Sequence, residues 1–368
     1  MLKKFLPPAF LLLLFSMCKE PEDDNKLVYD PKPVTLTQPQ FFPPIEIPAD
    51  NPLTEEGIQL GRRLFYDPIL SGDNTLACAG CHKQAEGFSD SRRFSKGIDG
   101  LDGTRNSMAI FNAVYPGSFF WDGRAASLEE QALQPVPNPV EMHEEWPNAV
   151  NELMHHPEYP KLFFYAFGDS AITKELAAKA IAQFVRTILS SNSRYDKYLR
   201  GELFGTANDW TDSEERGRTL FFTFFGDPQG GGDCIHCHGN ILFQNVTPSE
   251  QFRNNGLQEA ATLNDFQDKG LGEITHNPQD NGKFKVPSLR NIALTAPYMH
   301  DGRFNTLAEV VDFYSEGMKH SPNVDPLMEA SAQGGLHLTA QQKADLVNFL
   351  ESLTDSSLLS NPAFSSPF

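Results

Sequence analysis

The sequence predicts a mainly α-helical chain of two related domains with long irregular loops. Short amphipathic patterns with a helical period recur along the 368 residues, and loops rich in the 27 glycines and 27 prolines separate them. Alternating apolar runs of the kind that strands require are few. The two halves also share one order of elements, which predicts domains of related construction.

The first 53 residues are predicted to lie outside these domains. Residues 1–17 combine two lysines with an apolar run too short to span a bilayer, which is typical of an export signal. Cys18 stands where a bacterial lipoprotein carries its lipid-modified cysteine, and plain cleavage of the signal is the alternative. Residues 18–53 are rich in proline and charge without a sustained period, which indicates a tether. We therefore expect a periplasmic protein, attached to a membrane only if Cys18 carries lipid.

Several helix starts can be placed from capping patterns and apolar periodicity. A hydroxyl residue followed three positions later by Glu or Gln can satisfy the free backbone donors at a helix start. This pattern occurs at residues 127–130, 211–214, 306–309 and 339–342. Apolar stripes predict two further helices, over residues 55–65 and 173–189.

The domain boundary is predicted near residues 201–208. Residues 54–202 form the expected N-terminal domain, residues 203–356 the C-terminal domain, and residues 357–368 a tail. Each half begins with an amphipathic helix (EEGIQLGRRLF, then SEERGRTLFFT), continues with a loop containing Gly and Asp, and reaches Cys-x-x-Cys-His. This weak internal repeat indicates that both domains are built around the same kind of site.

The chain is strongly acidic, with a formal net charge of −18. Such a chain is a poor binder of nucleic acid. Attraction of a basic protein partner and mutual repulsion between copies both agree with this charge.

Four of the five cysteines lie in two copies of one pentapeptide, CAGCH at 78–82 and CIHCH at 234–238. Cys-x-x-Cys-His is the attachment signature of c-type haem, in which both thiols form thioethers with the porphyrin and the histidine binds iron. A zinc site would not require a histidine after both pairs, a thioredoxin-like pair needs a βαβ setting, and a disulfide across two residues would be strained. The expected haem-binding residues are Cys78, Cys81 and His82 in the first domain and Cys234, Cys237 and His238 in the second.

The second axial position of each iron decides what the haem can do. A filled position suits electron transfer, whereas an open one can bind peroxide. His236 lies inside its own attachment motif, which keeps it from being the distal ligand there. Spacing does not choose among the seven other free histidines: His143, His155, His156, His276, His300, His320 and His337.

Longer motifs resemble those of one known family. CAGCH, GTRNS, FFWDGRAASLEEQA, NPVEM, GDCIHCHGN and FKVPSLRNIALTAPYMHDG, with the spacings between them, are similar to motifs of the bacterial di-haem cytochrome c peroxidases and their relative MauG. The likeness covers residues 51–353. It implies two covalent haem c groups, one peroxide-reacting in the N-terminal cytochrome c-like domain and one transferring electrons in the C-terminal domain. It also implies hydrogen peroxide as substrate, a small cytochrome c or cupredoxin as electron donor, and a homodimer.

The resemblance assigns roles to residues near the first haem. Trp121 matches a tryptophan that lies between the two haems and assists electron passage. Glu141 matches the distal carboxylate that moves protons during cleavage of the O–O bond. Gln131 and Pro135 match further positions of that distal pocket. The alternatives are a plain core aromatic for Trp121 and a surface salt bridge for Glu141.

The resemblance also implies a calcium site between the domains. The side chain of Asn106 and the backbone carbonyls of Thr295 and Pro297 match its ligands. Oxygen ligands on converging loops suit that hard cation.

Two departures from the peroxidases affect the expected mechanism. Ile98 stands where they carry a histidine that caps the resting N-terminal haem, and no histidine lies between His82 and Trp121. This haem is therefore expected to rest open or water-bound, without need of reductive activation. At the C-terminal haem Tyr314 replaces the methionine ligand, as in MauG, and tyrosinate stabilises ferric iron. Met318, four residues further on the same helical face, is the alternative ligand.

These observations support two hypotheses about activity. The first is a di-haem peroxidase that reduces hydrogen peroxide to water with electrons from a small periplasmic redox protein. The second is a MauG-like oxidase that modifies a protein side chain through long-range electron transfer, which Tyr314 and Ile98 favour. A non-catalytic electron carrier would need both irons six-coordinate, and the missing histidine argues against it.

Overall fold

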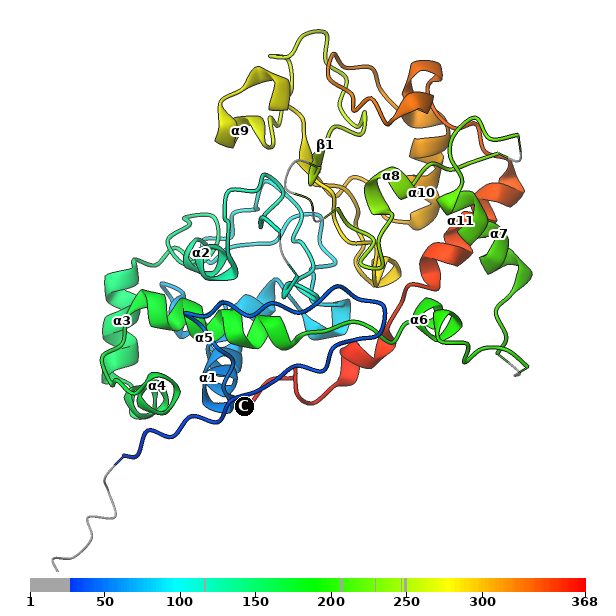
Figure 1. Cartoon of the computed structure of the whole chain (residues 1–368). Coiled ribbons are helices and arrows are strands. Elements are labelled where there is room, and N and C mark those ends of the chain that lie inside the picture. The colour runs from blue at the N-terminus through cyan, green and yellow to red at the C-terminus, as the bar shows by residue number, and fades with distance from the viewer. Residues whose placement is uncertain (1–26, 116, 206–207, 229, 246, 248–249) are drawn as a thin grey trace, which may run out of the picture.

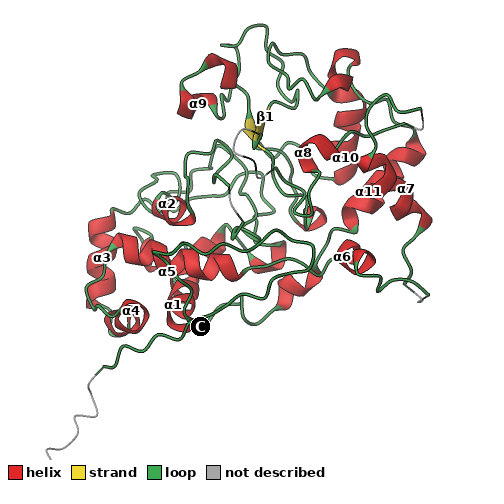
Figure 2. Ribbon diagram, in the orientation of Figure 1, coloured by secondary structure: helices red, strands yellow, loops and turns green. Residues whose placement is uncertain are grey.

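The structure is a computed structural model that describes residues 27–368 except 116, 206–207, 229, 246 and 248–249 (Figure 1). The described part is mainly helical, as the sequence predicts, with one antiparallel pair of short strands (Figure 2). The helices are α1 (Glu55–Tyr66), α2 (Leu128–Leu133), α3 (Trp146–His155), α4 (Tyr159–Phe167), α5 (Lys174–Thr187), α6 (Arg194–Leu199), α7 (Asp212–Phe222), α8 (Ile235–His238), α9 (Gly272–Thr275), α10 (Leu307–Asp312) and α11 (Ala340–Glu351). The strands are β1 (Phe252–Arg253) and β2 (Phe284–Lys285).

The N-terminal features predicted from the sequence fall partly outside the described residues. The signal over residues 1–17 and the lipid site at Cys18 both lie there. Within the ranges that the structure describes, no helix has both the length and the apolar character needed to cross a membrane.

Two hydrophobic cores divide the molecule. One core is formed by the five helices α1, α2, α3, α4 and α5. The other is formed by α7, α10 and α11 together with Tyr195 of α6. Figure 1 shows these two groups of helices at opposite ends of the molecule. The Tyr195 ring packs against Phe349 of α11, with centroids 5.4 Å apart. The chain therefore passes from the first core to the second between α5 and α6. This is earlier than residue 202, the predicted end of the first domain.

Each half is organised by one close crossing of two helices, α1 on α5 and α7 on α11. A Cβ on Gly61 would lie 1.8 Å from the carbonyl oxygen of Ala180, and a Cβ on Gly217 would lie 1.9 Å from that of Asp345. Only glycine allows the two backbones to approach so closely. A phenylalanine one turn further along the second helix completes each contact. The two crossings correspond residue for residue, which supports the internal repeat.

Helix starts follow the predicted capping chemistry. Of the four predicted positions, three form the reciprocal capping box: Thr211, Thr306 and Thr339. At α2 the Ser127 hydroxyl accepts a hydrogen bond from the Glu130 amide, but the Glu130 carboxylate accepts from the Ala126 amide and not from the cap. The helix predicted over residues 173–189 is α5, which Thr173 caps and which ends at Thr187.

Residues 27–53 pack along the body, so the predicted tether needs correction over this range. Phe42 is buried with its ring centroid 5.8 Å from that of Tyr115 in the N-terminal half. On its other side, the guanidinium carbon of Arg290 in the C-terminal half lies 4.4 Å from the Phe42 ring centroid. The apolar residues of the segment thus bind both halves together.

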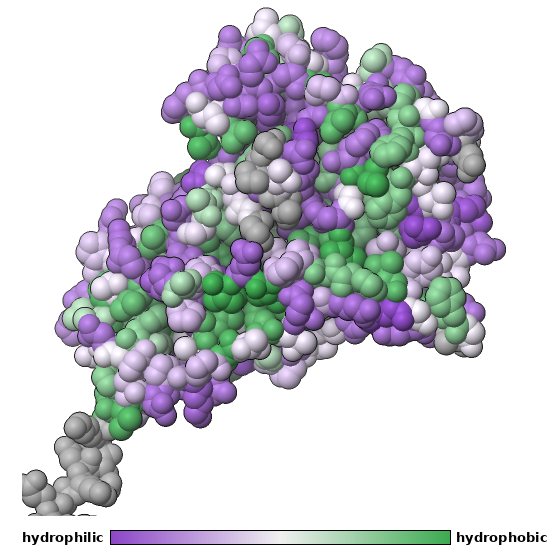
Figure 3. All heavy atoms as spheres, viewed as in Figure 1, coloured by the Kyte–Doolittle hydropathy of each residue, from purple (hydrophilic) through white to green (hydrophobic). Residues whose placement is uncertain are grey.

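On the face shown in Figure 3, apolar atoms gather near the middle, whereas the region around α9 is mostly hydrophilic.

The predicted tail, residues 357–368, is part of the N-terminal half. Gln84 donates a hydrogen bond to the carbonyl of Leu358 at 2.8 Å, and the Tyr66 hydroxyl donates to the carbonyl of Phe364 at 2.6 Å. The Phe364 ring packs edge-on against Phe88 with centroids 6.2 Å apart. Figure 1 shows the C-terminus beside α1. The chain therefore returns to its first helix.

The helix crossings predict a specific stability effect. Gly61→Ala and Gly217→Ala should each lower the free energy of unfolding by about 1–3 kcal/mol, because the added methyl group must push two helices apart. Gly103→Ala is the control, since its Cβ would meet nothing closer than 3.6 Å. Denaturant unfolding of the three variants measures the effect. An unchanged midpoint in Gly217→Ala would contradict the importance of the crossing.

Candidate functional site

The first pentapeptide lies in a 3-10 turn, Cys78–Gly80, against the N-terminal core. The His82 ring nitrogen Nδ1 lies 3.3 Å from the carbonyl oxygen of Phe88, and the Ser107 hydroxyl lies 3.4 Å from the same nitrogen. Burial lowers the pKa of His82, so its ring is neutral, which is the form that binds metal.

The second pentapeptide has the same arrangement around α8. His238 Nδ1 lies 2.7 Å from the carbonyl oxygen of Phe243, and burial lowers the pKa of His238 to about 4. Phe88 and Phe243 are both fully buried and both have a left-handed backbone, with φ of 59° and 52°. In each half a buried phenylalanine thus turns its carbonyl onto Nδ1. This contact orients the ring and leaves Nε2 available to an iron.

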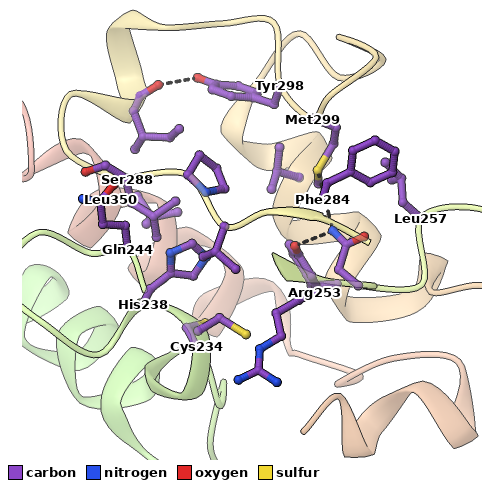
Figure 4. A pocket seen from close by; sticks show the side chains of 18 of the residues that line it. Cys234, His238, Gln244, Arg253, Leu257, Phe284, Ser288, Tyr298, Met299 and Leu350 are labelled. Atoms are coloured by element: carbon purple, nitrogen blue, oxygen red, sulfur yellow. Dashed lines mark hydrogen bonds between the residues drawn. The ribbon is translucent and has the colours of Figure 1, made fainter. Parts of the chain in front are cut away.

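A cavity extends from the second pentapeptide to the boundary between the two halves (Figure 4). Cys234, Cys237 and His238 line it, and so do Asn106 and Trp121 of the N-terminal half. Most of the wall between them is apolar. Its members include Val286, Leu289, Leu307, Val310, Val311 and Leu350. Two thiols, a neutral imidazole and an apolar cavity fit a covalently bound haem.

Trp121 lies at this boundary and contacts both halves. Its indole N–H donates to the carbonyl of Asn106 at 2.8 Å, and its own carbonyl accepts from the amide of Lys285 at 2.8 Å. Its ring centroid is 6.5 Å from that of His300, which stacks on Phe284 at 3.5 Å. The indole is therefore held in one orientation in the cavity wall.

Glu141 lies beside the first pentapeptide. Burial raises the pKa of Glu141, while Arg124 and a 2.7 Å hydrogen bond from Asn138 oppose this rise. Burial also raises the pKa of the Cys78 thiol to about 12, with additions from Cys81 and from the charge of Glu141. The carboxyl is therefore close to the thiols, in a half-buried place, and is not part of a surface salt bridge.

The backbone around Glu141 is bonded to Ile98 and to Pro135, one of the other two predicted distal residues. The Ile98 amide donates to the carbonyl of Glu141 at 3.0 Å. The carbonyl of Pro135 accepts from the Met142 amide at 3.3 Å and so braces the turn that carries Glu141. Gln131 is half-buried on α2, one turn before this segment.

Tyr314 and Met318 both line the cavity that contains His238. Tyr314 is half-buried, its hydroxyl accepts a hydrogen bond from Asn255 at 2.9 Å, and burial raises its pKa well above the usual value. It lies in a π-helical turn, Phe313–Gly317, that follows α10. Met318 comes after this turn with an extended backbone, so the prediction that it continues the same helical face is wrong. The wider turn ends the helix at Gly317.

The three predicted calcium ligands also line the cavity. The side-chain amide of Asn106 donates to the carbonyls of Arg92 and Arg93, each at 3.2 Å. Its oxygen accepts no hydrogen bond from any residue in the described part of the chain. That oxygen and the nearby carbonyls of Thr295 and Pro297 suit a hard cation.

Of the seven free histidines, His300 alone lines this cavity, and its ring is stacked on Phe284. The other six lie on the exposed or half-exposed surface. The sequence analysis does not single out Asn255 or Lys285, which both line the cavity. No local pattern marks Asn255. Lys285 lies within the FKVPSLRN motif, and this motif is the sequence signal that could have marked it as a site residue.

Comparison with known proteins finds relatives that agree with the two haem-attachment motifs. Residues 55–203 match the family model described as di-haem cytochrome c peroxidase. The chain is 35% identical over 336 residues to cytochrome-c peroxidase IdrP1 of Pseudomonas sp. (strain SCT), covering 85% of this chain and 84% of that protein. It is 30% identical over 325 residues to the methylamine utilization protein MauG of Methylophilus methylotrophus, covering 87% and 89%. The crystal structure of a MauG-like protein associated with microbial copper homeostasis matches with a TM-score of 0.80 and 37% identity, covering 91% and 99%.

The burial of Glu141 predicts a pH-dependent stability effect. Since the folded state raises its pKa above the ordinary 4.5, ionisation of this carboxyl opposes folding. The cost is absent below the unfolded pKa and grows as the pH rises toward the folded value. Glu141→Gln should therefore raise the melting temperature relative to wild type at about pH 7 and leave it unchanged at about pH 4. Glu259→Gln, at an exposed position, should show no such difference. An equal effect of Glu141→Gln at both pH values would be inconsistent with the raised pKa.

Proposed function

The chain belongs to the family of di-haem cytochrome c peroxidases and MauG, and on this premise we propose that it reduces hydrogen peroxide to water. The reaction consumes two electrons and two protons for each peroxide and forms two waters. The electrons come from a small cytochrome c or cupredoxin. The observation that carries the proposal is the half-buried Glu141 with a raised pKa beside the first pentapeptide.

Two c-type haems are implied by membership of the family. Cys78, Cys81 and His82 would hold the first, and Cys234, Cys237 and His238 would hold the second. When bound, the haems would supply irons that exchange electrons, and the first would be the one that reacts with peroxide. Ile98 supports this assignment, because an aliphatic side chain cannot bind iron as the histidine of the peroxidases does.

Glu141 acts as the acid–base group for the O–O bond. Heterolysis requires that a proton leave the near oxygen and reach the departing one. A carboxyl whose pKa is raised toward the working pH can both accept and release this proton. The hydrogen bond from Asn138 holds the carboxyl in place, and the carbonyl of Pro135 braces the turn behind it.

Trp121 lies on the proposed route of electrons between the two sites. It lines the cavity of the second pentapeptide and is bonded to Asn106, which belongs to the same loop as Ser107 beside His82. An oriented indole that lines one site and is bonded to the loop beside the other would shorten the gaps that an electron must cross.

A second function, long-range oxidation of a protein side chain as in MauG, is favoured by Tyr314 together with Ile98. Tyrosinate on the second iron would stabilise the ferric state and make that site a poor electron reservoir. The hydrogen bond from Asn255 to the Tyr314 oxygen would stabilise the anionic ligand.

Further features of the proposal concern location and assembly. The predicted signal supports a periplasmic protein, with Cys18 as a possible point of lipid attachment. Asn106, Thr295 and Pro297 are proposed to bind calcium, and a homodimer is proposed from the family resemblance. The acidic charge suits a basic electron donor.

Steady-state kinetics test the peroxidase and the role of Glu141. Wild-type enzyme that has not been pre-reduced should turn over hydrogen peroxide with reduced cytochrome c. Glu141→Gln should slow this turnover by about a hundredfold, because the proton carrier is lost. Glu259→Gln should retain the wild-type rate. Absence of turnover with any donor would leave protein oxidation as the remaining function, and a near-normal rate in Glu141→Gln would remove its acid–base role.

Spectroscopy decides the ligand of the second iron. Tyr314→Phe should change the low-spin absorption and electron paramagnetic resonance signals, because the phenolate ligand is lost. Met318→Leu, which keeps a side chain of similar volume in the same cavity, should leave them unaltered. The reverse pattern would assign Met318 as the ligand.

A further inference from the structure

Lys285 is a half-buried cation without an acidic partner among the described residues. Its ammonium group donates to the carbonyl of Ser118 at 2.5 Å and lies 5.3 Å from the ring centroid of Phe119. Burial lowers the pKa of Lys285 to about 8. Among the described residues it forms no ion pair with a carboxylate. A buried ammonium without a counter-charge is costly, so the fold retains it against a free-energy penalty.

The position of Lys285 indicates what it faces. It lines the central cavity together with Trp121 and His300, at the boundary between the two halves. The other lysine or arginine side chain in the described lining is Arg253, which is ion-paired with Asp325 at 2.8 Å. Lys285 is therefore the cation of the cavity that remains available to an added anion.

The two cations leave opposite faces of the β1–β2 pair, because Arg253 is registered opposite Phe284 and Lys285 opposite Phe252. Burial raises the pKa of the Cys237 thiol to about 11, and the nearby Arg253 guanidinium opposes this rise. Figure 4 likewise shows the Arg253 guanidinium on the side of Cys234. Lys285 is instead joined to the N-terminal half, because its amide bonds to the Trp121 carbonyl and its ammonium bonds to the Ser118 carbonyl.

A c-type haem has a matching asymmetry. Its thioether bonds form along one edge of the porphyrin, and its two propionate groups leave from the opposite edge. A haem joined to Cys234 and Cys237 would therefore extend its carboxylates toward the end of the cavity away from the thiols. A carboxylate buried there needs a cation or several hydrogen-bond donors.

We propose that Lys285 binds a propionate of the C-terminal haem and so positions that haem beside Trp121. The inference rests on the haem sites of the proposed function but holds whether peroxide or a protein is the final substrate. The same residue also fixes the loop of Trp121 at two points, through its amide on the Trp121 carbonyl and its ammonium on the Ser118 carbonyl. The propionate and the Trp121 loop are thereby tied to one residue.

The test is the reduction potential of the C-terminal haem, measured by spectroelectrochemical titration over a range of pH on protein that carries both haems. In Lys285→Met the unpaired propionate should titrate roughly 1–3 pH units higher than in wild type. Above that pH the uncompensated negative charge should favour ferric iron and lower the potential. Below it, protonation should restore the wild-type potential. Lys285→Arg keeps the charge and should behave as wild type.

Lys283→Met is the matched control, because Lys283 lies two residues away and is ion-paired with Asp280 at 3.0 Å. It should leave the potential and its pH dependence unchanged. A wild-type curve in Lys285→Met would overturn the inference, and so would equal shifts in the two methionine variants. A haem stain on a denaturing gel separates this failure from that of the proposed function, since wild-type protein without covalent haem would refute the haem sites themselves. If Lys285→Met does not assemble, a shifted curve in Lys285→Gln supports the inference and an unshifted one overturns it.

Discussion

Each half of the molecule depends on one contact between two helices whose backbones touch at a glycine. Gly61 and Gly217 make this approach possible, and each crossing brings an early helix of its half against the last one. The long loop between these helices must then close on itself, and it carries the Cys-x-x-Cys-His motif. Because this segment contains long irregular stretches between its short helices, it can surround a large group with side chains of its own. Two similar frames therefore support two similar sites.

The two sites share their proximal side and differ on the opposite one. His82 and His238 are oriented in the same way, each by the carbonyl of a buried phenylalanine. Around the first motif the structure gathers a carboxyl with a raised pKa and an aliphatic Ile98, whereas the second cavity contains a half-buried phenol. The chemical difference between the halves thus depends on a few distal side chains, not on the fold.

Local signals in the sequence were sufficient for much of this picture. The helical class, the capping boxes and the paired pentapeptides all depend on residues within a few positions of one another. Contacts between distant segments were not predictable in this way. The packing of Phe42 between the halves, the pairing of Tyr195 with the second core and the bond from Asn255 to Tyr314 each need the folded chain. The π-helical turn before Met318 also escaped prediction, because one extra residue per turn leaves no mark on apolar periodicity.

The return of the last residues to the first helix has a consequence for biosynthesis. Gln84, two residues after the first motif, is bonded to the carbonyl of Leu358, and Phe88 is covered by Phe364. The ribosome makes these partners nearly 300 residues apart in sequence. The wall behind the earlier motif is thus completed only after the C-terminal half has been made. Until then that motif stays uncovered, which is the period in which a bulky prosthetic group can still be introduced and joined to it.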